Sequence, residues 1–295
     1  MLPQALIDRL RYIEIYTTRA VRNHRAGDYL SRIRGRSFEF DEHKPYQPGA
    51  DTRQIDWNVT ARMQAPFIKR EMEEKELGVT IVVDLSASML FTSAAVTKRA
   101  LAVEAAAALA FSAAADNINT GLLAFTDRVE CYHRPKRGNM HAWRLVEDLY
   151  ALRPAGHKTS FEPALERLAA AVKQTALVFC ISDFIDAESF WGSRHLSALI
   201  RRVDLVPVVL EDRWEETMPE TGGYVRFRDA EYGDAAVLPL TARKTHGYAA
   251  VLRERRENTR EWFYRLGLDH IALSTGDDAL KRIVAFFMSR RRTRR

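Results

Sequence analysis

A short run of oxygen-bearing side chains follows the first strongly apolar segment of the sequence. Val79-Thr-Ile-Val-Val83 is rich in β-branched residues, which is typical of a strand buried on both faces of a sheet. It leads directly into Asp84-Leu-Ser-Ala-Ser88. A turn with this spacing presents one carboxylate and two hydroxyls at alternate positions. The three side chains are therefore predicted to direct their oxygens at one place.

Two further residues of this chemical kind stand next to expected strand and helix ends. Thr159 lies in the loop Gly156-His-Lys-Thr-Ser160, just before an expected helix, and Asp183 follows the apolar segment 176–181. Ligands of doubly wound sheets lie beyond the carboxyl ends of the strands, where the strand order reverses. With the order 3-2-1-4-5-6, strands 1 and 4 are neighbours about 4.8 Å apart. Asp84 and Asp183 are then expected to face each other.

The predicted ligand set is Asp84, Ser86, Ser88, Thr159 and Asp183. Five oxygen groups without a cysteine or an essential histidine are typical of a hard-cation site, which indicates Mg²⁺, or else Mn²⁺ or Ca²⁺. Hydroxyls are neutral, so two carboxylates only just balance a divalent charge, and an open position would attract an external carboxylate. This pattern favours binding through a metal over hydrolysis. The alternative is that the serines cap the next helix and Asp84 is a turn residue.

The elements that must position these residues form an alternating pattern from residue 77 onward. Strands alternating with helices predict a mostly parallel sheet with helices on both faces. The expected strands are 79–83, 120–125, 129–133, 176–181, 205–210 and 270–273, and the expected helices are 94–115, 140–152, 161–173, 188–200, 241–266 and 279–289. The strands 120–125 and 129–133 are expected to pair as a hairpin, and a second hairpin is expected in an insertion at about 214–240. The fold class is therefore α/β, doubly wound, with sheet order 3-2-1-4-5-6.

Residues 1–76 are expected to form an N-terminal extension that packs on the main domain, residues 77–290. An amphipathic helix is expected over 6–21, with Ile7, Leu10, Ile13 and Ile15 near one face. A strand within 67–75 is expected to lean on the main sheet. Arg53, Asp56 and Arg62 are expected to form a charge-assisted network that ties the extension to the sheet, and Trp57 is expected to anchor it by apolar contact.

The ordered set of five oxygen ligands resembles the metal-ion-dependent adhesion site of von Willebrand factor A domains. The resemblance rests on Asp84-x-Ser86-x-Ser88, followed by Thr159 and Asp183. It implies a Rossmann-like A-type fold in which the serines and the threonine ligate the ion directly or nearly so, and the aspartates act directly or through water. It also implies that a partner protein supplies a Glu or Asp.

The N-terminal extension is similar to the segment that precedes the A-like domain in the domain-of-unknown-function 58 family. The similarity rests on Phe38-Glu-Phe40, Tyr46-Gln-Pro-Gly-Ala-Asp51, Arg53-Gln-Ile-Asp-Trp57 and Ala61-Arg62, and it extends to Asp229-Ala-Glu-Tyr-Gly233 and Leu273-Ser-Thr-Gly276. The signature residues are Tyr46, Gly49, Asp51, Arg53, Asp56, Trp57 and Arg62. Ala50 departs from the pattern, because that family usually has a second acidic residue there.

The similarity to this family implies a function. Its members are typically bacterial, are encoded beside MoxR-type AAA+ ATPases, and are thought to act with them in complex assembly, maturation or metal insertion. One branch is associated with methanol dehydrogenase maturation. The expected function is thus a non-enzymatic, metal-dependent protein-binding module that serves as an adaptor or co-chaperone of such an ATPase.

The composition is that of a globular protein. Of 295 residues, 46% are hydrophobic and 28% are charged, which excludes wholesale disorder. No apolar run is long enough to span a bilayer, and the first residues lack the features of a signal peptide. Only two cysteines, Cys131 and Cys180, are present, so a disulfide framework is excluded and a cytoplasmic location is expected.

No motif of a common enzyme class occurs. Gly156-His-Lys-Thr159 lacks the glycine spacing of a phosphate-binding loop, and neither a Gly-x-Ser-x-Gly elbow nor a His-Glu-x-x-His pair is present. We therefore expect a non-enzyme. A phosphatase-like, metal-dependent hydrolase that uses the same pocket remains the alternative.

The net charge of +6 is accompanied by a basic C-terminus, Arg290-Arg-Arg-Thr-Arg-Arg295. We expect a solvated tail over 291–295 past the last helix, because no aromatic residue lies among these arginines. Binding of nucleic acid, or of an acidic membrane surface, through this tail is the alternative.

Overall fold

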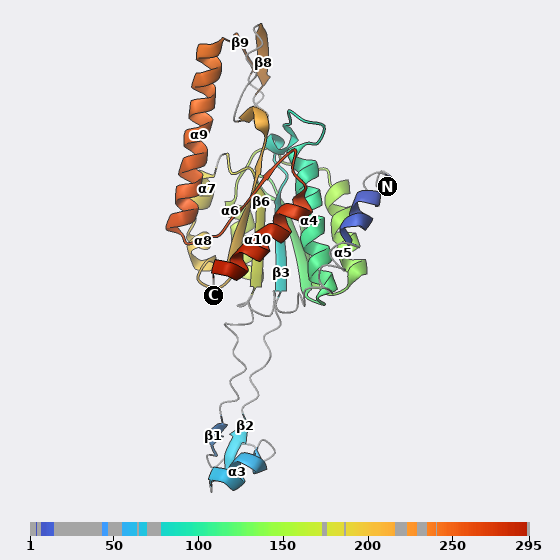
Figure 1. Ribbon diagram of the computed structural model, residues 1–295, viewed down its shortest axis with the longest axis vertical. Helices are drawn as coiled ribbons and strands as arrows, with labels where there is room; N and C mark the ends of the chain where they lie inside the picture. Colours follow the sequence, from blue (N-terminus) through green and yellow to red (C-terminus); the bar gives the residue numbers. More distant parts are fainter. Residues whose placement is uncertain are drawn as a thin grey trace.

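The computed structural model describes residues 4, 7–14, 43–46, 55–63, 65–69, 78–172, 176–185, 187–215, 223–228, 235–239 and 241–293 (Figure 1). Three of the signature residues, Gly49, Asp51 and Arg53, lie outside these ranges, and so does the segment 229–233. All five predicted ligands lie inside them, as does most of the main domain.

A six-stranded sheet forms the centre of the molecule. Its strands are β3 (Gly78–Asp84), β4 (Asn119–Phe125), β5 (Val129–Lys136), β6 (Ala176–Ser182), β7 (Asp204–Glu211) and β10 (Ile271–Ser274). Their order is β10-β7-β6-β3-β4-β5, which is 3-2-1-4-5-6 when the strands of this sheet are numbered along the chain. Each neighbouring pair is parallel except β4 and β5, which form an antiparallel hairpin. The predicted strand order and hairpin are confirmed.

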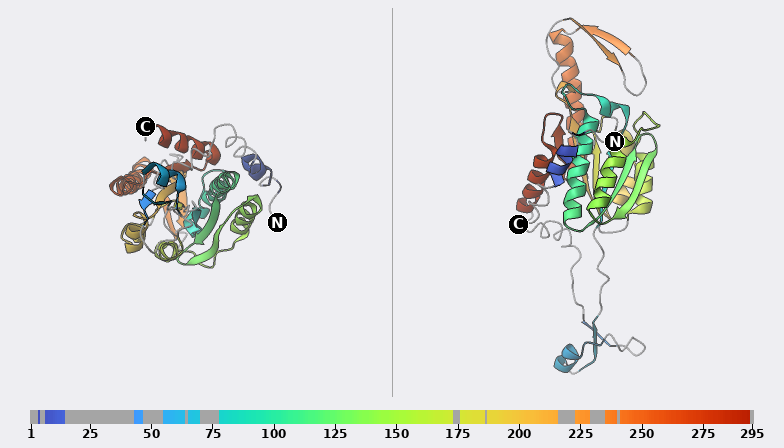
Figure 2. Two further views of the ribbon diagram at one scale, coloured as in Figure 1. Left: turned by 90° about the horizontal axis from the view of Figure 1, so that it is seen from below. Right: turned by 90° about the vertical axis from the view of Figure 1, so that its right-hand side faces the viewer.

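Helices cover both faces of the sheet (Figure 2). On one face lie α4 (Lys98–Ala115), α5 (Asn139–Ala151) and α10 (Ala279–Thr293), and on the other lie α6 (Glu162–Ala171), α7 (Glu188–Trp191), α8 (Arg194–Leu199) and the end of α9 (Ala242–Arg265). Side chains of a strand alternate between the two faces. In β3, Ile81 and Val83 therefore join the first core, and Val82 joins the second.

One expected helix is divided in the structure, and another begins later than expected. The expected helix 188–200 is divided into α7 and α8, because Ser193 Oγ accepts hydrogen bonds from the backbone nitrogens of His195 and Leu196 and so begins a new helix. The expected helix from residue 94 begins only at Lys98, where Thr97 accepts a capping hydrogen bond from Ala100 N. Most alanines of α4 are buried, so this helix packs closely on the sheet.

The expected insertion forms an antiparallel hairpin of β8 (Tyr224–Arg228) and β9 (Ala235–Pro239). Figure 1 shows it beside the first turns of α9, at the end of the molecule where the strand β3 terminates. The predicted hairpin is confirmed.

Two described parts of the N-terminal extension differ in their packing. The helical residues 7–14 place Leu10 and Ile13 in the core, both 0% exposed. The strand β2 (Phe67–Lys69) pairs with β1 (His43–Pro45) in a separate two-stranded sheet beside α3 (Trp57–Met63). The expectation that this strand leans on the main sheet is wrong, because the strand forms a separate two-stranded sheet with β1.

The described signature residues have local roles in this small unit. Asp56 Oδ1 accepts hydrogen bonds from the backbone nitrogens of Asn58 and Val59 and caps α3. Tyr46 N donates to Pro66 O. Arg62 is exposed on α3. The side chain of Trp57 is 70% exposed, so the prediction that it anchors the extension is wrong, since α3 buries none of its residues.

The C-terminal helix extends farther than expected. The helix α10 ends at Thr293, past the predicted end at 289. Arg290, the first arginine of the basic run, is not solvated. Its guanidinium contacts Asp204 at 2.9 Å and Asp269 at 2.6 Å, and its side chain is only 12% exposed. Within the described ranges, we find no helix with the length and apolar character that crossing a bilayer requires.

Candidate metal site

The turn after β3 holds three of the five predicted ligands in a fixed arrangement. Asp84 is 0% exposed, and its Oδ1 accepts a hydrogen bond of 2.8 Å from Ser86 N. The Oγ atoms of Ser86 and Ser88 are 3.1 Å apart. Ser86 precedes the short helix η3 (Ala87–Leu90) but makes no side-chain capping bond to it. Capping is therefore not what places the hydroxyl of Ser86.

The fourth predicted ligand, Asp183, lies across the strand boundary from Asp84. The strands β3 and β6 are neighbours in register, and Ser182 Oγ donates a hydrogen bond of 2.7 Å to Asp84 Oδ2. Burial, together with the negative charge of Asp183, raises the pKa of Asp84 to about 7. The two carboxylates that the sequence predicted to face each other are therefore close enough to repel.

The loop of the fifth predicted ligand, Thr159, is held against the turn after β3. Ala87 N donates a backbone hydrogen bond of 2.9 Å to His157 O, two residues before Thr159. On its other side, the loop is bound by Glu130, which accepts hydrogen bonds from the backbone nitrogens of Ala155 and Gly156. Thr159 itself is half-buried. The structure thus brings the threonine loop to the serine turn.

Gly156 is required for this close approach. A Cβ atom at this position would lie 2.0 Å from Asp127 Oδ1 and 2.2 Å from Thr126 Oγ1. The residue is buried, and Ser160 N donates to Thr126 O farther along the loop. Only a residue without a side chain allows the loop to pack on the turn between β4 and β5.

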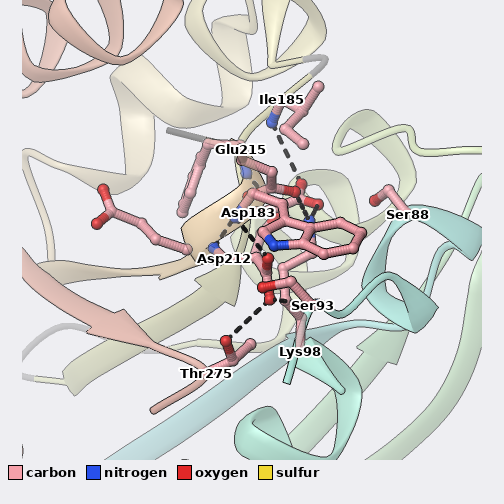
Figure 3. Close-up of polar contacts among 12 residues, drawn as sticks. Ser88, Ser93, Lys98, Asp183, Ile185, Asp212, Glu215 and Thr275 are labelled. Carbon is pink, nitrogen blue, oxygen red and sulfur yellow. Dashed lines mark hydrogen bonds and ion pairs between the residues drawn. The ribbon is translucent and has the colours of Figure 1, made fainter. Parts of the chain in front are cut away.

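A buried lysine contacts the candidate site, and the sequence did not indicate it. Lys98, the first residue of α4, is 0% exposed, and its Nζ lies 2.6 Å from Asp183 Oδ2 and 2.5 Å from Glu215 Oε1 (Figure 3). Burial alone would lower the pKa of Lys98, but the charges of Asp183 and Glu215 outweigh it and the pKa is raised. The ammonium is therefore charged and compensates the carboxylate of Asp183.

Another buried carboxylate, that of Asp212, joins three segments around this lysine (Figure 3). Asp212 is 1% exposed. It accepts hydrogen bonds from Ser93 N at 2.9 Å, from Thr275 Oγ1 at 2.9 Å and from Trp214 N at 2.9 Å. Because of these bonds, the loop before α4, the loop after β10 and η4 (Arg213–Glu215) have fixed positions around the site.

The residue after Asp183 has an unusual backbone conformation. Phe184 has φ of 53°, in the left-handed region that side chains other than glycine rarely adopt. Its ring stacks on Phe161 at 5.5 Å and packs edge-on against Phe263 of α9 at 5.5 Å. This packing offsets the backbone strain. In this conformation, Ile185 N donates a hydrogen bond of 3.2 Å to Asp183 Oδ1. Aromatic contacts therefore hold Asp183 in place.

The donor set fits a hard divalent cation. All candidate ligands are hydroxyl or carboxylate oxygens, and the repulsion between Asp84 and Asp183 is of the kind that a cation relieves. Within the described residues, no group of three or more His, Cys, Asp or Glu side chains is arranged to hold a metal. A cation here would therefore depend on the serine and threonine hydroxyls as well as on the aspartates.

Sequence reasoning missed Ser182, Lys98, Asp212 and Glu215. Ser182 ends an apolar strand immediately before Asp183, and this polar residue at a strand end was a usable signal. Lys98 begins an alanine-rich helix, where a lysine is usually solvated. Asp212 and Glu215 stand at the entry to the insertion, and no local pattern distinguishes them from exposed loop residues.

The chain matches a protein family and two uncharacterized mycobacterial proteins. A family model described as "Protein of unknown function DUF58" matches residues 42–258. The uncharacterized protein Rv1480 of Mycobacterium tuberculosis (strain ATCC 25618 / H37Rv) is 29% identical over 285 residues, covering 96% of this chain and 89% of that protein. The uncharacterized protein Mb1516 of Mycobacterium bovis (strain ATCC BAA-935 / AF2122/97) matches with the same values.

Solved structures show weaker similarities. The conserved hypothetical protein BatB from Bacteroides thetaiotaomicron aligns with a TM-score of 0.41 and 15% identity over 72% of this chain and 98% of that chain. The PilB minor pilin from Streptococcus sanguinis aligns with a TM-score of 0.34 and 13% identity over 78% of this chain and 64% of that chain. The family match spans most of the chain, and the chain therefore belongs to the DUF58 family, a protein family of unknown function.

Proposed function

We propose that this protein is a non-enzymatic module that binds a partner protein through a divalent cation, Mg²⁺ or else Mn²⁺ or Ca²⁺. The observation that carries the proposal is the hydrogen-bonded group of Asp84, Ser86 and Ser88 at the end of β3, which Ser182 joins to the end of β6, directly before Asp183. The threonine loop supports it, because Ala87 donates a hydrogen bond to His157 next to that loop. The order of these residues resembles the adhesion site of von Willebrand factor A domains.

The candidate ligands fall into a buried group and a half-buried group, which would contact different sides of the ion. Asp84 and Ser86 are fully buried and Asp183 is 9% exposed, so they would hold the ion from the sheet side. Ser88 and Thr159 are half-buried and border the solvent side, where a partner's carboxylate would arrive. Bound there, the cation supplies the positive charge that attracts this carboxylate. Ser182 positions Asp84 through its hydrogen bond.

Apolar residues flank the solvent side of the site. Leu90 is 56% exposed, Phe91 is 37% exposed and Trp214 is 41% exposed. Leu90 and Phe91 directly follow the serine turn, and Trp214 N is held by Asp212, which also holds the loop after Phe91 at Ser93. A partner residue that brings an acid to the ion would find apolar surface beside it.

The proposed partner is an AAA+ ATPase of the MoxR type, or its client protein. The proposal rests on the resemblance of the sequence to proteins encoded beside such ATPases, and it assigns this chain an adaptor or co-chaperone role in assembly, maturation or metal insertion. Nucleic-acid binding through the C-terminus is less favoured, because Arg290 is paired with Asp204 and Asp269.

Titration of the purified protein with Mg²⁺ and Mn²⁺ by calorimetry tests the metal. The wild type should bind one ion, and Asp84→Asn should lose binding while it remains folded by circular dichroism. Asp148→Asn, at a 43% exposed carboxylate on α5, is the matched control and should bind as the wild type does. Absence of binding in the wild type would contradict the proposal.

Binding to a purified MoxR-type ATPase from the same genome tests the partner. Binding should occur in Mg²⁺, be lost in EDTA and be lost with Asp84→Asn. Metal-independent binding that Asp84→Asn leaves unchanged would show that the site does not serve the partner. Turnover of phosphate esters in Mg²⁺ that disappears with Asp84→Asn would instead support the hydrolase alternative.

A further inference from the structure

We infer that Lys98 is a built-in counter-cation of the proposed metal site, and that Lys98 and Glu215 together set how tightly the site binds a divalent ion. The inference rests on the proposed function and assigns roles to two residues outside the five ligands. Lys98 contacts Asp183, and Glu215 contacts Lys98.

The contacts of Asp183 show why Lys98 matters to a bound ion. Asp183 Oδ2 lies 2.6 Å from Lys98 Nζ, and Asp183 Oδ1 accepts a hydrogen bond of 3.2 Å from Ile185 N. The ammonium is fully enclosed, because the side chain of Lys98 is 0% exposed and that of Asp183 is 2% exposed. In such a low-dielectric place a positive charge acts strongly on its neighbours. Lys98 therefore weakens the attraction of Asp183 for another cation.

Glu215 acts in the opposite direction. Its Oε1 lies 2.5 Å from Lys98 Nζ, and its Oε2 accepts a hydrogen bond of 3.1 Å from Asp212 N. One ammonium is thus shared between two carboxylates. Glu215 takes up part of the charge of Lys98, which leaves Asp183 more negative toward an ion. A second cation, Arg256, lies 3.7 Å from Glu215 Oε2 and moderates this effect.

The charges also explain how the metal-free protein tolerates its carboxylates. Asp84 is 0% exposed, and its pKa is already raised by burial and by Asp183. Without a positive charge nearby, Asp183 and Glu215 would add two more uncompensated charges to the same region. Lys98 supplies one positive charge that remains when no ion is bound. Lys98 should therefore stabilise the metal-free protein at the expense of metal affinity.

Two substitutions separate these roles. Lys98→Met keeps the length of the side chain and removes the charge. Glu215→Gln keeps an acceptor for Asp212 N and removes the charge that competes for Lys98. Titration with Mn²⁺ alone, followed by the electron paramagnetic resonance signal of the free ion, should show affinity about tenfold tighter in Lys98→Met. It should be several-fold weaker in Glu215→Gln.

Thermal unfolding provides a readout that does not depend on the affinity measurement. In EDTA, Lys98→Met should unfold at a lower temperature than the wild type, and saturating Mg²⁺ should restore most of the difference. Arg290→Met is the matched control, because Arg290 is paired with Asp204 and Asp269, where Asp204 begins β7 at the opposite ends of the strands from the site. Its loss of stability should not respond to Mg²⁺.

The outcomes distinguish this inference from the proposed function. If the wild type binds Mn²⁺ and both variants bind it with the same affinity, the inference is overturned and the proposed function stands. If the wild type binds no Mn²⁺, both the proposed metal site and this inference are contradicted. If Lys98→Met does not fold without metal, Glu215→Gln still decides, and unchanged affinity in that variant overturns the inference.

Discussion

Ser182 joins the ends of two neighbouring parallel strands by donating a 2.7 Å hydrogen bond from its Oγ to Asp84 Oδ2. Ser182 Oγ also accepts a hydrogen bond of 3.1 Å from Phe184 N. One hydroxyl, 0% exposed, thus connects the buried aspartate after β3 to the strained segment after β6. It orders the two carboxylates of the candidate site relative to each other.

Replacing this hydroxyl should weaken both the fold and the site. Ser182→Ala leaves the buried Phe184 N without its partner and removes a donor to Asp84, which should lower the free energy of unfolding by about 1–3 kcal/mol. Urea denaturation followed by circular dichroism measures the change. Ser112→Ala is the control, because the half-buried hydroxyl of Ser112 donates to Ala108 O within its own helix α4. Its removal should cost at most about 1 kcal/mol.

The positive φ of Phe184 predicts that a glycine at this position is more stable than an alanine. Removing the ring in Phe184→Ala should cost about 3–5 kcal/mol, because the residue is 3% exposed and packs on Phe161 and Phe263. Phe184→Gly should be more stable than Phe184→Ala by about 1 kcal/mol, since glycine adopts the left-handed region without strain. Chemical denaturation of both variants provides the test. A glycine variant less stable than the alanine variant would show that the backbone is not strained there.

A methyl group at Gly156 should displace the threonine loop. Gly156→Ala places Cβ against Thr126 and Asp127, and we expect a loss of about 1–3 kcal/mol of stability together with weaker binding of Mn²⁺. Gly247→Ala on α9 is the matched control, since a Cβ there meets nothing within 4 Å. It should be neutral or stabilising by up to about 1 kcal/mol. If Gly156→Ala and Gly247→Ala had the same effect on Mn²⁺ binding, the threonine loop would not contribute to the metal site.

The burial of Asp116, which follows the last turn of α4, should make the stability of the protein depend on pH. Burial raises its pKa to about 6 from 3.8, so its contribution to stability is present below pH 3.8 and is lost as the pH rises through 6. Asp116→Asn should therefore be more stable than the wild type at pH 7.5, by about 1 kcal/mol after allowance for solvent screening.

The same comparison at low pH checks the cause. In urea titrations at about pH 2.5, well below 3.8, the carboxyl group of Asp116 is almost fully protonated in both the folded and the unfolded state. The difference in stability between wild type and Asp116→Asn should then vanish. A difference that persists at the low pH would mean that hydrogen bonding rather than charge burial distinguishes the two side chains.

The amino-acid sequence alone indicated the buried strands and the polar residues that follow them. The run 176–181 is apolar at every position, and the run 79–83 at every position but Thr80. This local pattern is sufficient to indicate buried strands. Asp84 and Asp183 follow two of these strands directly. Once the order 3-2-1-4-5-6 is adopted, their approach follows from strand spacing alone.

The tertiary structure decided which charged residues are buried. Lys98 and Arg290 appear in the sequence as an ordinary helix-terminal lysine and as the first arginine of a basic run. Only the fold places Asp183 and Glu215 around the lysine, and Asp204 and Asp269 around the arginine. Trp57, expected to be anchored, is 70% exposed for the same reason. Burial of a side chain depends on what lies opposite it in space, and partners distant in the sequence leave no local pattern.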